Sequence, residues 1–393
     1  MTVNVMPRQK LLSSRVVRSL RSIALVSAIV VVAGILFSPD RMWANWLLVS
    51  YYAVTLGLGG VCLVAINYVT GSTWSIAIRR IPEGLSTLMP VAAVGLGVVF
   101  LVRPELYIWT MGDFGLLPES ALAFKRWWLD WSFFLIRTVG YILLWTLFAW
   151  AIRKQSHQQD TDRAVRHTIV NRRLSAIFLV VLAFSFSLAS FDWVMSLEPA
   201  WFSTIFAIYN FAGLFSSTLA CVILLVIWLE SAGPLAGVLT DEHLHDLGKL
   251  LFAFSTFWAY IWFSQYMLIW YANITEETVY FITRTHGPWL GFFVLNLVLN
   301  WLVPFALLLR RDMKRHRRVM VLVAVVVLLG RWVDLSLMIF PPVVGEMLPS
   351  IWEVGAVAGA ASLVILWIAR ALASVPIVPV GDPQLPDSLH YHQ

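Results

Sequence analysis

The sequence predicts an all-α, polytopic membrane protein. Of its 393 residues, 60% are hydrophobic and only 13% are charged. A soluble domain of that composition would leave large apolar patches in contact with water. The apolar residues gather in runs of about 20, which is the length of a helix that crosses a bilayer. Within lipid, backbone polar groups are satisfied only in helices or closed β-barrels, and runs of this length indicate helices.

Ten such runs predict ten transmembrane helices in one membrane domain, 20–373. In chain order they cover about 20–38, 46–69, 85–102, 127–152, 174–195, 201–230, 247–271, 288–310, 319–340 and 351–373. A cytoplasmic N-terminal segment, 1–19, precedes them, and an extended proline-rich tail, 374–393, follows. The longest loops, 103–126, 153–173 and 272–287, leave room for a short interfacial helix at most.

Lysine and arginine are distributed unevenly between the two sets of loops. With ten spans, 21 of them would lie on the side of both termini and five on the other side. Cytoplasmic loops carry the excess of basic residues, so both termini are expected in the cytoplasm. Ser38-Pro39-Asp40-Arg41, after the first run, lacks a small-residue cleavage site. We therefore expect the first run to remain as a helix rather than to be removed as a signal peptide.

Small residues within the spans have ordinary structural explanations. Gly355 and Gly359 fit a small-xxx-small contact between helices. Cys62 and Cys221 each lie inside an apolar run and are expected to be small buried hydrophobes rather than disulfide partners.

A short corner, Ser196-Leu197-Glu198-Pro199, joins the fifth and sixth runs on the side opposite the termini. Asp192 ends the fifth run, and a carboxylate at the edge of a membrane span is costly unless it has a partner or a function. Pro199 suits the first turn of the sixth helix, and Glu198 before it would complement the positive end of that helix. Glu198 therefore has a structural role available beside a functional one.

Five ionisable residues are expected within the spans, all in the half nearest the corner. They comprise three acids and two arginines: Asp130, Arg137, Asp192, Arg331 and Asp334. Arg137 follows Asp130 by seven positions and Arg331 precedes Asp334 by three, so each pair shares a helix face. Because arginine stays charged, one acid of a five-member cluster would lack a full partner and would have a raised pKa. No carboxylate is expected well inside the other half of the spans.

Two roles for this cluster remain open. A protonatable carboxyl suits a proton relay or a quinol-binding site, whereas ion pairs that only fix helix packing would carry no protons. The proton-path candidates are Asp130, Arg137, Asp192, Arg331 and Asp334, with Glu198 and Glu353 at the rim. A quinol pocket beside them would be lined by Trp193, Tyr209, Tyr266 and Gln265.

The sequence shows no cofactor site of its own. None of its eight histidines lies in the middle of a span, which argues against haem held by pairs of membrane histidines. There is no metal-ligand spacing, no P-loop, no dinucleotide fingerprint and no nucleophile elbow. Membrane topology explains the basic loops without nucleic acid. We expect no metal and no catalytic residue in this chain, and any part in electron transfer would be played within a complex.

Three stretches resemble one family of membrane subunits. They are FDWVMSLEP at 191–199 with WFSTIF at 201–206, FWAYIWFSQY at 257–266 with IWYANI at 269–274 and EET at 276–278, and RWVDL at 331–335 running to Pro341. These strings are similar to segments of the ActF subunits of alternative complex III, an NrfD/PsrC-like family. The resemblance covers most of the fifth to ninth spans.

The resemblance implies two four-helix bundles flanked by two further helices in a bacterial inner (cell) membrane. It implies a haem-free subunit of a quinol:electron acceptor oxidoreductase of a respiratory or photosynthetic chain, serving as scaffold and proton path. The expected partners are an ActC-like paralogous membrane subunit, the iron–sulfur subunit ActB, cytochrome c subunits and small membrane subunits. The complex would contain haem c and iron–sulfur clusters and would oxidise menaquinol or another quinol. The alternatives are direct quinol binding by this subunit and a stand-alone membrane transporter.

Overall fold

The computed structural model describes residues 11–115, 117, 119–345 and 350–391, and these residues form helices and loops without a strand. The first half contains α1 (Ser14–Phe37), α2 (Pro39–Thr70), α3 (Arg80–Leu85), α4 (Leu88–Val102), α5 (Glu119–Trp128), α6 (Trp131–Asp162) and α7 (Arg166–Trp193). The second contains α8 (Phe206–Ser231), α9 (Asp241–Ala272), α10 (Thr275–Thr285), α11 (Trp289–Leu297), α12 (Val303–Leu308), α13 (Arg311–Arg315), α14 (Arg317–Val344), α15 (Ile351–Ala373) and α16 (Leu385–Leu389).

Nine stretches of the described chain are long and apolar enough to cross a membrane. They are α1, α2, α6, α7, α8, α14 and α15, the stretch that includes α3 and α4, and the stretch from α11 to α12. The predicted class, an all-α polytopic membrane protein, is confirmed. The predicted seventh span corresponds to α9, a helix of 32 residues that is not among these nine. The count of ten spans therefore stays a prediction.

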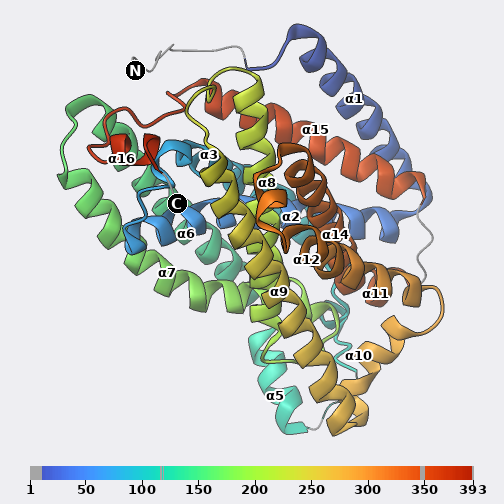
Figure 1. The fold of residues 1–393 in the computed structure, drawn as a ribbon. Coiled ribbons are helices and arrows are strands. Elements are labelled where there is room, and N and C mark those ends of the chain that lie inside the picture. Colours follow the sequence, from blue (N-terminus) through green and yellow to red (C-terminus); the bar gives the residue numbers. More distant parts are fainter. Residues whose placement is uncertain (1–10, 116, 118, 346–349, 392–393) are drawn as a thin grey trace.

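Helix α2 lies at the centre of the molecule and α1 at its edge. In the most apolar stretch of each helix, 83% of α2 is buried against 11% of α1. Helix α2 contacts α4, α7, α8, α14 and α15, while α1 lies mainly along α15 (Figure 1). A Cβ atom on Gly355 would lie 2.5 Å from Val30 Cγ1, and one on Gly359 would lie 2.7 Å from Ser27 Cβ. The predicted small-xxx-small contact is thus the contact between α15 and α1.

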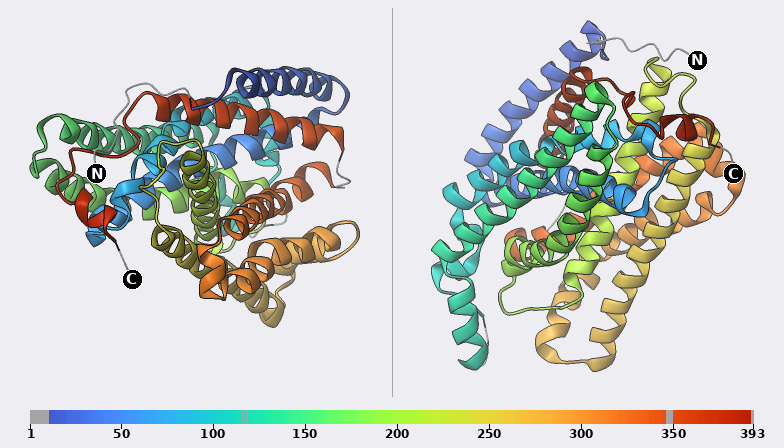
Figure 2. Two further views of the ribbon diagram at one scale, coloured as in Figure 1. Left: turned by 45° about the horizontal axis from the view of Figure 1, so that its top comes forward. Right: turned by 90° about the vertical axis from the view of Figure 1, so that its left-hand side faces the viewer.

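The remaining helices pack as two groups of neighbours. Helix α6 packs on α7 and α4, and both α4 and α7 pack on α2; in the second half, α8 packs on α9 and α14, and α14 also contacts α11 and α12. Two four-helix bundles would require such contacts between neighbouring helices. The bundle arrangement stays a prediction. Figure 2 shows the two groups from two further directions.

Successive long helices run in opposite directions, which defines two ends of the molecule. The corner end holds α5, α10, the short helix Met195–Leu197 and the rest of the connection from α7 to α8, and Figure 1 shows α5 and α10 projecting there. The basic end holds the connections 71–79, 163–165, 232–240 and 309–316 and the C-terminal tail. Helix α10 lies within the predicted loop 272–287. Helix α5 begins in the predicted loop 103–126 and ends just beyond it.

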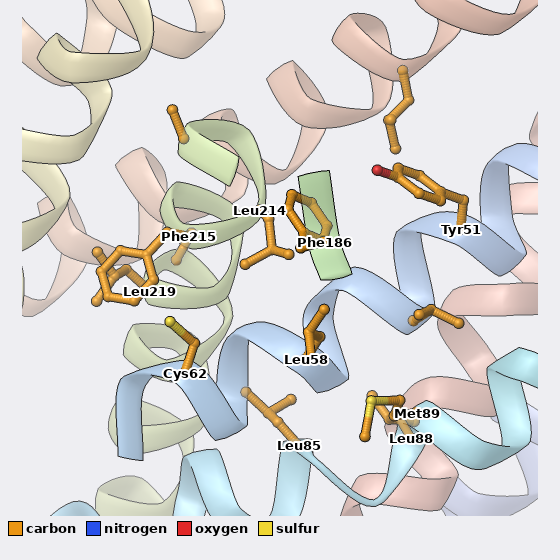
Figure 3. Packing of buried hydrophobic residues seen from close by; sticks show 14 of the residues in the cluster. Tyr51, Leu58, Cys62, Leu85, Leu88, Met89, Phe186, Leu214, Phe215 and Leu219 are labelled. Carbon is orange, nitrogen blue, oxygen red and sulfur yellow. The ribbon is translucent and has the colours of Figure 1, made fainter. Parts of the chain in front are cut away.

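Glycines let α2 approach its neighbours at backbone distance. A Cβ on Gly57 would lie 2.8 Å from the Met89 nitrogen, and one on Gly60 would lie 2.6 Å from the Pro82 carbonyl oxygen. On the opposite face, a Cβ on Gly59 would lie 1.9 Å from Thr218 Oγ1. Between these contacts, apolar side chains of α2, α4, α7 and α8 fill the core (Figure 3). Small residues at helix contacts are the usual means of close packing in membranes, where hydrophobic burial between helices adds little.

The stretch from α11 to α12 contains a π-helical turn, Val298–Leu302, just before Pro304. Proline lacks a backbone donor, and a π-turn is one way for a membrane helix to accommodate it. Asn300 Nδ2 donates to the main-chain carbonyl of Asn296 (3.1 Å) and to its side-chain Oδ1 (2.7 Å). The irregular turn thereby fixes Asn296, which is part of the site described below.

The C-terminal tail differs from the extended segment that its composition predicts. It folds back over the basic end and includes α16. Arg79 Nη1 binds Asp382 Oδ2 at 2.7 Å, and Ser388 Oγ accepts from the backbone of Ala77 at 3.1 Å. The guanidinium of Arg79 and the backbone N–H of Ala77 thus hold the tail against the helices. The composition of the tail does not reveal these partners.

Candidate functional site: two buried arginine–aspartate pairs

Asp192, on the last turn of α7, is fully buried and forms a two-point ion pair with Arg137 of α6. Arg137 Nε lies 2.9 Å from Asp192 Oδ2, and Arg137 Nη2 lies 2.9 Å from Oδ1. Trp128 Nε1 donates to Oδ1 at 2.8 Å and the Tyr141 hydroxyl donates to Oδ2 at 3.0 Å. Each carboxylate oxygen thus accepts two hydrogen bonds. Bidentate arginine–carboxylate geometry of this kind is the strong form of such a pair.

Aromatic rings cover this pair on the side of the corner end. The Arg137 guanidinium lies 4.2 Å from the ring centre of Trp128 and 4.3 Å from that of Phe133. Trp128 is the last residue of α5, so this interfacial helix closes over the pair. Lys125 of α5 also donates to the Pro199 carbonyl oxygen, and burial lowers the pKa of its amino group. Helix α5 therefore ties the corner to the Asp192 pair.

Asp334 of α14 forms the second pair, with Arg331 one turn earlier. Arg331 Nη1 lies 2.5 Å from Asp334 Oδ2, and both side chains are buried. The Tyr209 hydroxyl donates to Oδ1, and Asn296 Nδ2 donates to the same oxygen at 3.1 Å. Arg331 Nη2 also donates to Asn210 Oδ1 at 2.8 Å. Helices α8, α11 and α14 therefore converge on this carboxylate.

The expected single cluster is thus two separate pairs. Each pair holds one acid and one arginine, and in the described chain no ion pair links Arg137–Asp192 to Arg331–Asp334. The prediction of one acid in surplus is wrong, because the third acid, Asp130, lies elsewhere. Asp130 is exposed and serves as the N-cap of α6, where Oδ1 accepts from the Phe133 nitrogen at 3.0 Å. Aspartate is a preferred N-cap residue, and the helix begins at Trp131 rather than near 127.

Glu198 at the corner has a partner that the sequence does not suggest. Helix α8 begins at Phe206, so Pro199 does not occupy its first turn, and that prediction is wrong. Glu198 Oε1 instead lies 2.5 Å from Nη2 of Arg284, a buried residue of α10. Arg284 also donates to the carbonyl oxygens of Leu337 (2.7 Å) and Tyr280 (2.8 Å). The ion pair with Arg284, rather than helix capping, therefore accounts for the carboxylate at position 198.

Glu353 caps the start of α15 and is also ion-paired. It completes a capping box with Ser350 and lies 2.7 Å from Nε of Arg41. Asn45 Nδ2 donates to it at 3.0 Å. Glu353 thereby joins α15 to the first turns of α2 at the corner end. These contacts position helices and leave the carboxylate fully hydrogen-bonded.

The four side chains expected around a quinol do not surround one space. Trp193 is buried beside the first pair, with Nε1 donating to Thr138 Oγ1 at 3.0 Å. Tyr209 belongs to the second pair. Tyr266 stacks on Trp262 of the same helix, with 6.2 Å between ring centres, and packs edge-on against Phe281 at 5.1 Å. Gln265 is buried next to it on α9.

The basic end contains a buried carboxylate that sequence reasoning missed. Glu83 of α3 lies 2.8 Å from Arg80 Nη1 and accepts from Ser156 Oγ at 2.6 Å. Arg80 also pairs with Asp160, and Arg79 with Asp382. Glu83 lies just before the predicted third span, 85–102, so the expectation of no carboxylate well inside this half stays a prediction. The available signal was the spacing of Arg79 and Arg80 to Glu83, which places all three on neighbouring helix positions.

Several polar atoms of the two pairs have no hydrogen-bond partner within the described residues. They are Arg137 Nη1 and Arg331 Nε, together with Nδ2 of Asn210, the residue that Arg331 contacts. Buried donors are costly when unpaired, so such atoms are natural contacts for water or a polar ligand. The side chains of the two pairs thus offer charged groups and hydroxyls as hydrogen-bond partners. No group of three or more metal-ligating side chains occurs in the described part of the chain.

Comparison with known proteins adds no family to this description. No family model matches the chain. No curated protein matches it either.

Proposed function

We propose that this chain is a haem-free integral membrane subunit of a bacterial quinol:electron acceptor oxidoreductase of the alternative complex III type. Its role would be that of scaffold and proton path. One observation carries the proposal: the segments that resemble ActF also supply the buried charges. FDWVMSLEP contains Asp192, and RWVDL contains both Arg331 and Asp334.

The contacts within the pairs support a proton-path role. Tyr141 and Tyr209 each donate a hydroxyl hydrogen bond to a buried aspartate. Arg137 Nη1 has no hydrogen-bond partner among the described residues, and the Ser190 hydroxyl lies on α7 within one turn of Asp192 and Trp193. Chains of carboxylates, hydroxyls and water are the usual components of proton relays in membranes. The balanced charge of each pair means that the carboxylate would accept a proton only as its arginine contact loosens.

Affinity purification of the chain from native membranes tests the assignment to a complex. The proposal expects co-purification of haem c, visible in reduced-minus-oxidised spectra, together with a second NrfD-like membrane subunit and an iron–sulfur subunit. Purification of the chain alone from membranes that oxidise quinol would refute it.

Substitutions then test the path. D192N and D334N, measured in the assembled complex in vesicles, should lower proton uptake per electron more than they lower quinol oxidation. D130N is the matched control, because Asp130 is exposed and outside both pairs. Assembled complex with unchanged coupling in both test variants would leave the pairs with a packing role only.

Direct quinol binding is the second candidate, and Gln265 favours it. Its Nε2 atom is buried without a hydrogen-bond partner among the described residues, next to the aromatic group of Trp262, Tyr266 and Phe293. An amide donor beside aromatic rings suits a quinol oxygen and its ring. An azido-quinone probe would label α9 if this candidate holds, and Q265A should reduce that labelling.

A further inference from the structure

We propose that the basic end carries a binding site for the headgroup of an anionic phospholipid, between α3, α6 and α15. A cavity of about 440 Å³ lies between these three helices, and an open hollow of about 430 Å³ on the surface of α6 adjoins it. Arg153 and His157 of α6 line both cavities. Arg370 of α15 lines the first and Lys154 of α6 lines the second. The proposal is independent of the role in quinol oxidation.

The cations around the cavities outnumber the acids. Arg153, Lys154 and Arg370 have no carboxylate within ion-pair distance in the part of the chain that the structure describes. Arg79 and Arg80 are already paired with the neighbouring acids. Four cations line the cavities, Arg80, Arg153, Lys154 and Arg370, and one acid, Glu83. With Asp160, which also pairs with Arg80, two positive charges remain in excess. An anion is therefore the ligand that the charge favours.

The position along the helices points to a headgroup. Arg153 lies about 33 Å along α6 from its first residue, at 1.5 Å per residue, which matches the thickness of a bilayer's hydrocarbon core. Arg370 lies in the last turn of α15, whose first residue lies at the opposite end. These guanidinium groups are therefore expected near the phosphate level of one leaflet. Basic pockets between transmembrane helices at that level are a known form of lipid-headgroup site.

The surroundings favour a lipid over a free phosphate ion. Trp150 and Trp367, both partly exposed, flank the cavities. Indoles are enriched at this depth of a membrane, because one part of the ring is apolar and the N–H is polar. Trp367 Nε1 is held by Thr87 Oγ1 at 3.0 Å. Beyond the tryptophans, exposed Leu147 and Leu363 continue the apolar surfaces of α6 and α15 toward the middle of the membrane, where acyl chains would lie.

Native mass spectrometry of the detergent-purified protein, or of its complex, tests the site. Phosphatidylglycerol and phosphatidylcholine are titrated separately, and the bound fraction gives the preference for the anionic lipid. We expect the wild type to prefer phosphatidylglycerol, and each arginine substitution to reduce that preference about fivefold. R153Q/R370Q should therefore bind both lipids almost equally.

Two further variants control for folding and for general surface charge. K154Q/R370Q alters two exposed side chains and should also reduce the preference. R173Q removes an exposed cation at the same end, outside both cavities, and should leave the preference unchanged. An equal loss in R173Q would mean that the whole basic surface, not this site, attracts the lipid.

Two other outcomes would also overturn the proposal. Displacement of phosphatidylglycerol by free inorganic phosphate would assign the site to a soluble anion. Unchanged lipid preference in R153Q/R370Q, with loss of a co-purifying subunit, would assign it to a protein partner.

Discussion

Removing the charge of Asp192 should destabilise the protein strongly. In D192N the guanidinium of Arg137 keeps its charge in a buried site and loses its counter-ion. The carboxylate accepts four hydrogen bonds, two on each oxygen, from Arg137, Trp128 and Tyr141. Asparagine has one acceptor oxygen, so its NH₂ group would face two donors. Breaking a buried pair by removing one partner costs about 3–5 kcal/mol, and we expect D192N to fall in that range.

The free energy of unfolding is measured by SDS titration in mixed micelles, followed by tryptophan fluorescence. D130N is the matched control: asparagine caps helices as well as aspartate does, and Asp130 is exposed, so we expect a change of less than about 0.5 kcal/mol.

A double variant separates the loss of the pair from the burial of a lone charge. R137M/D192N removes the stranded arginine and should recover most of the stability that D192N loses, because the main cost of breaking a buried pair is the uncompensated charge that remains. Equal losses in D192N and D130N, or a double variant no more stable than D192N, would refute the reasoning.

Three further perturbations follow from single contacts. In G213A the new methyl would lie 2.4 Å from Arg331 Nη1 and should displace that guanidinium from its pair, lowering stability by about 1–3 kcal/mol in the same SDS titration. In G381A the methyl would lie 2.0 Å from the Gln159 carbonyl oxygen, so the C-terminal tail should lift and become sensitive to limited proteolysis. Burial raises the pKa of Tyr280 to about 12 from its usual 10, so folding should lose stability as the pH rises from 10 to 12, and Y280F should lose less.

Each of these has an internal control. No neighbouring atom lies within 4 Å of a Cβ built on Gly97 of α4, so G97A should be neutral or slightly stabilising, since alanine favours helix by about 1 kcal/mol. A G213A variant as stable as G97A would show that Arg331 moves aside without cost. Tail cleavage in G381A no faster than in wild type would mean that the backbone shifts instead. Identical alkaline unfolding of wild type and Y280F would exclude Tyr280 as the titrating group.

The sequence predicts the class of fold and one of the two buried ion pairs, but not the other. Arg331 and Asp334 are three apart on one helix, so their pairing follows from helical geometry. Arg137 and Asp192 lie on different helices, and their pairing depends on how α6 packs on α7. The predicted span 127–152 includes Asp130, whereas α6 begins at Trp131 and Asp130 is its exposed N-cap.

Two basic residues expected in loops are instead buried, and they hold carboxylates that the sequence leaves without a partner. Lysines and arginines in loops indicate which loops face the cytoplasm. This rule for membrane orientation assumes that the basic side chains are in contact with water. Arg80 and Arg284 are instead buried, and they hold Glu83 and Glu198. A loop arginine that folds back against the helices has the same sequence signature as one in water. Only the tertiary structure separates these cases.

The balance of charge within each pair limits how either could carry protons. A surplus acid would hold a proton at rest, but Asp192 and Asp334 each face one arginine and several neutral donors. If the pairs carry protons as proposed, proton entry would have to weaken an existing ion pair. Tyr141 and Tyr209 are the hydroxyl groups in direct contact with these carboxylates, so they are the groups through which a proton would reach them. Y141F and Y209F keep the rings and the pairs, and a relay through these groups predicts lower proton coupling with little loss of stability. If coupling stays unchanged in both, the pairs serve to fix the helices and the proton path lies elsewhere.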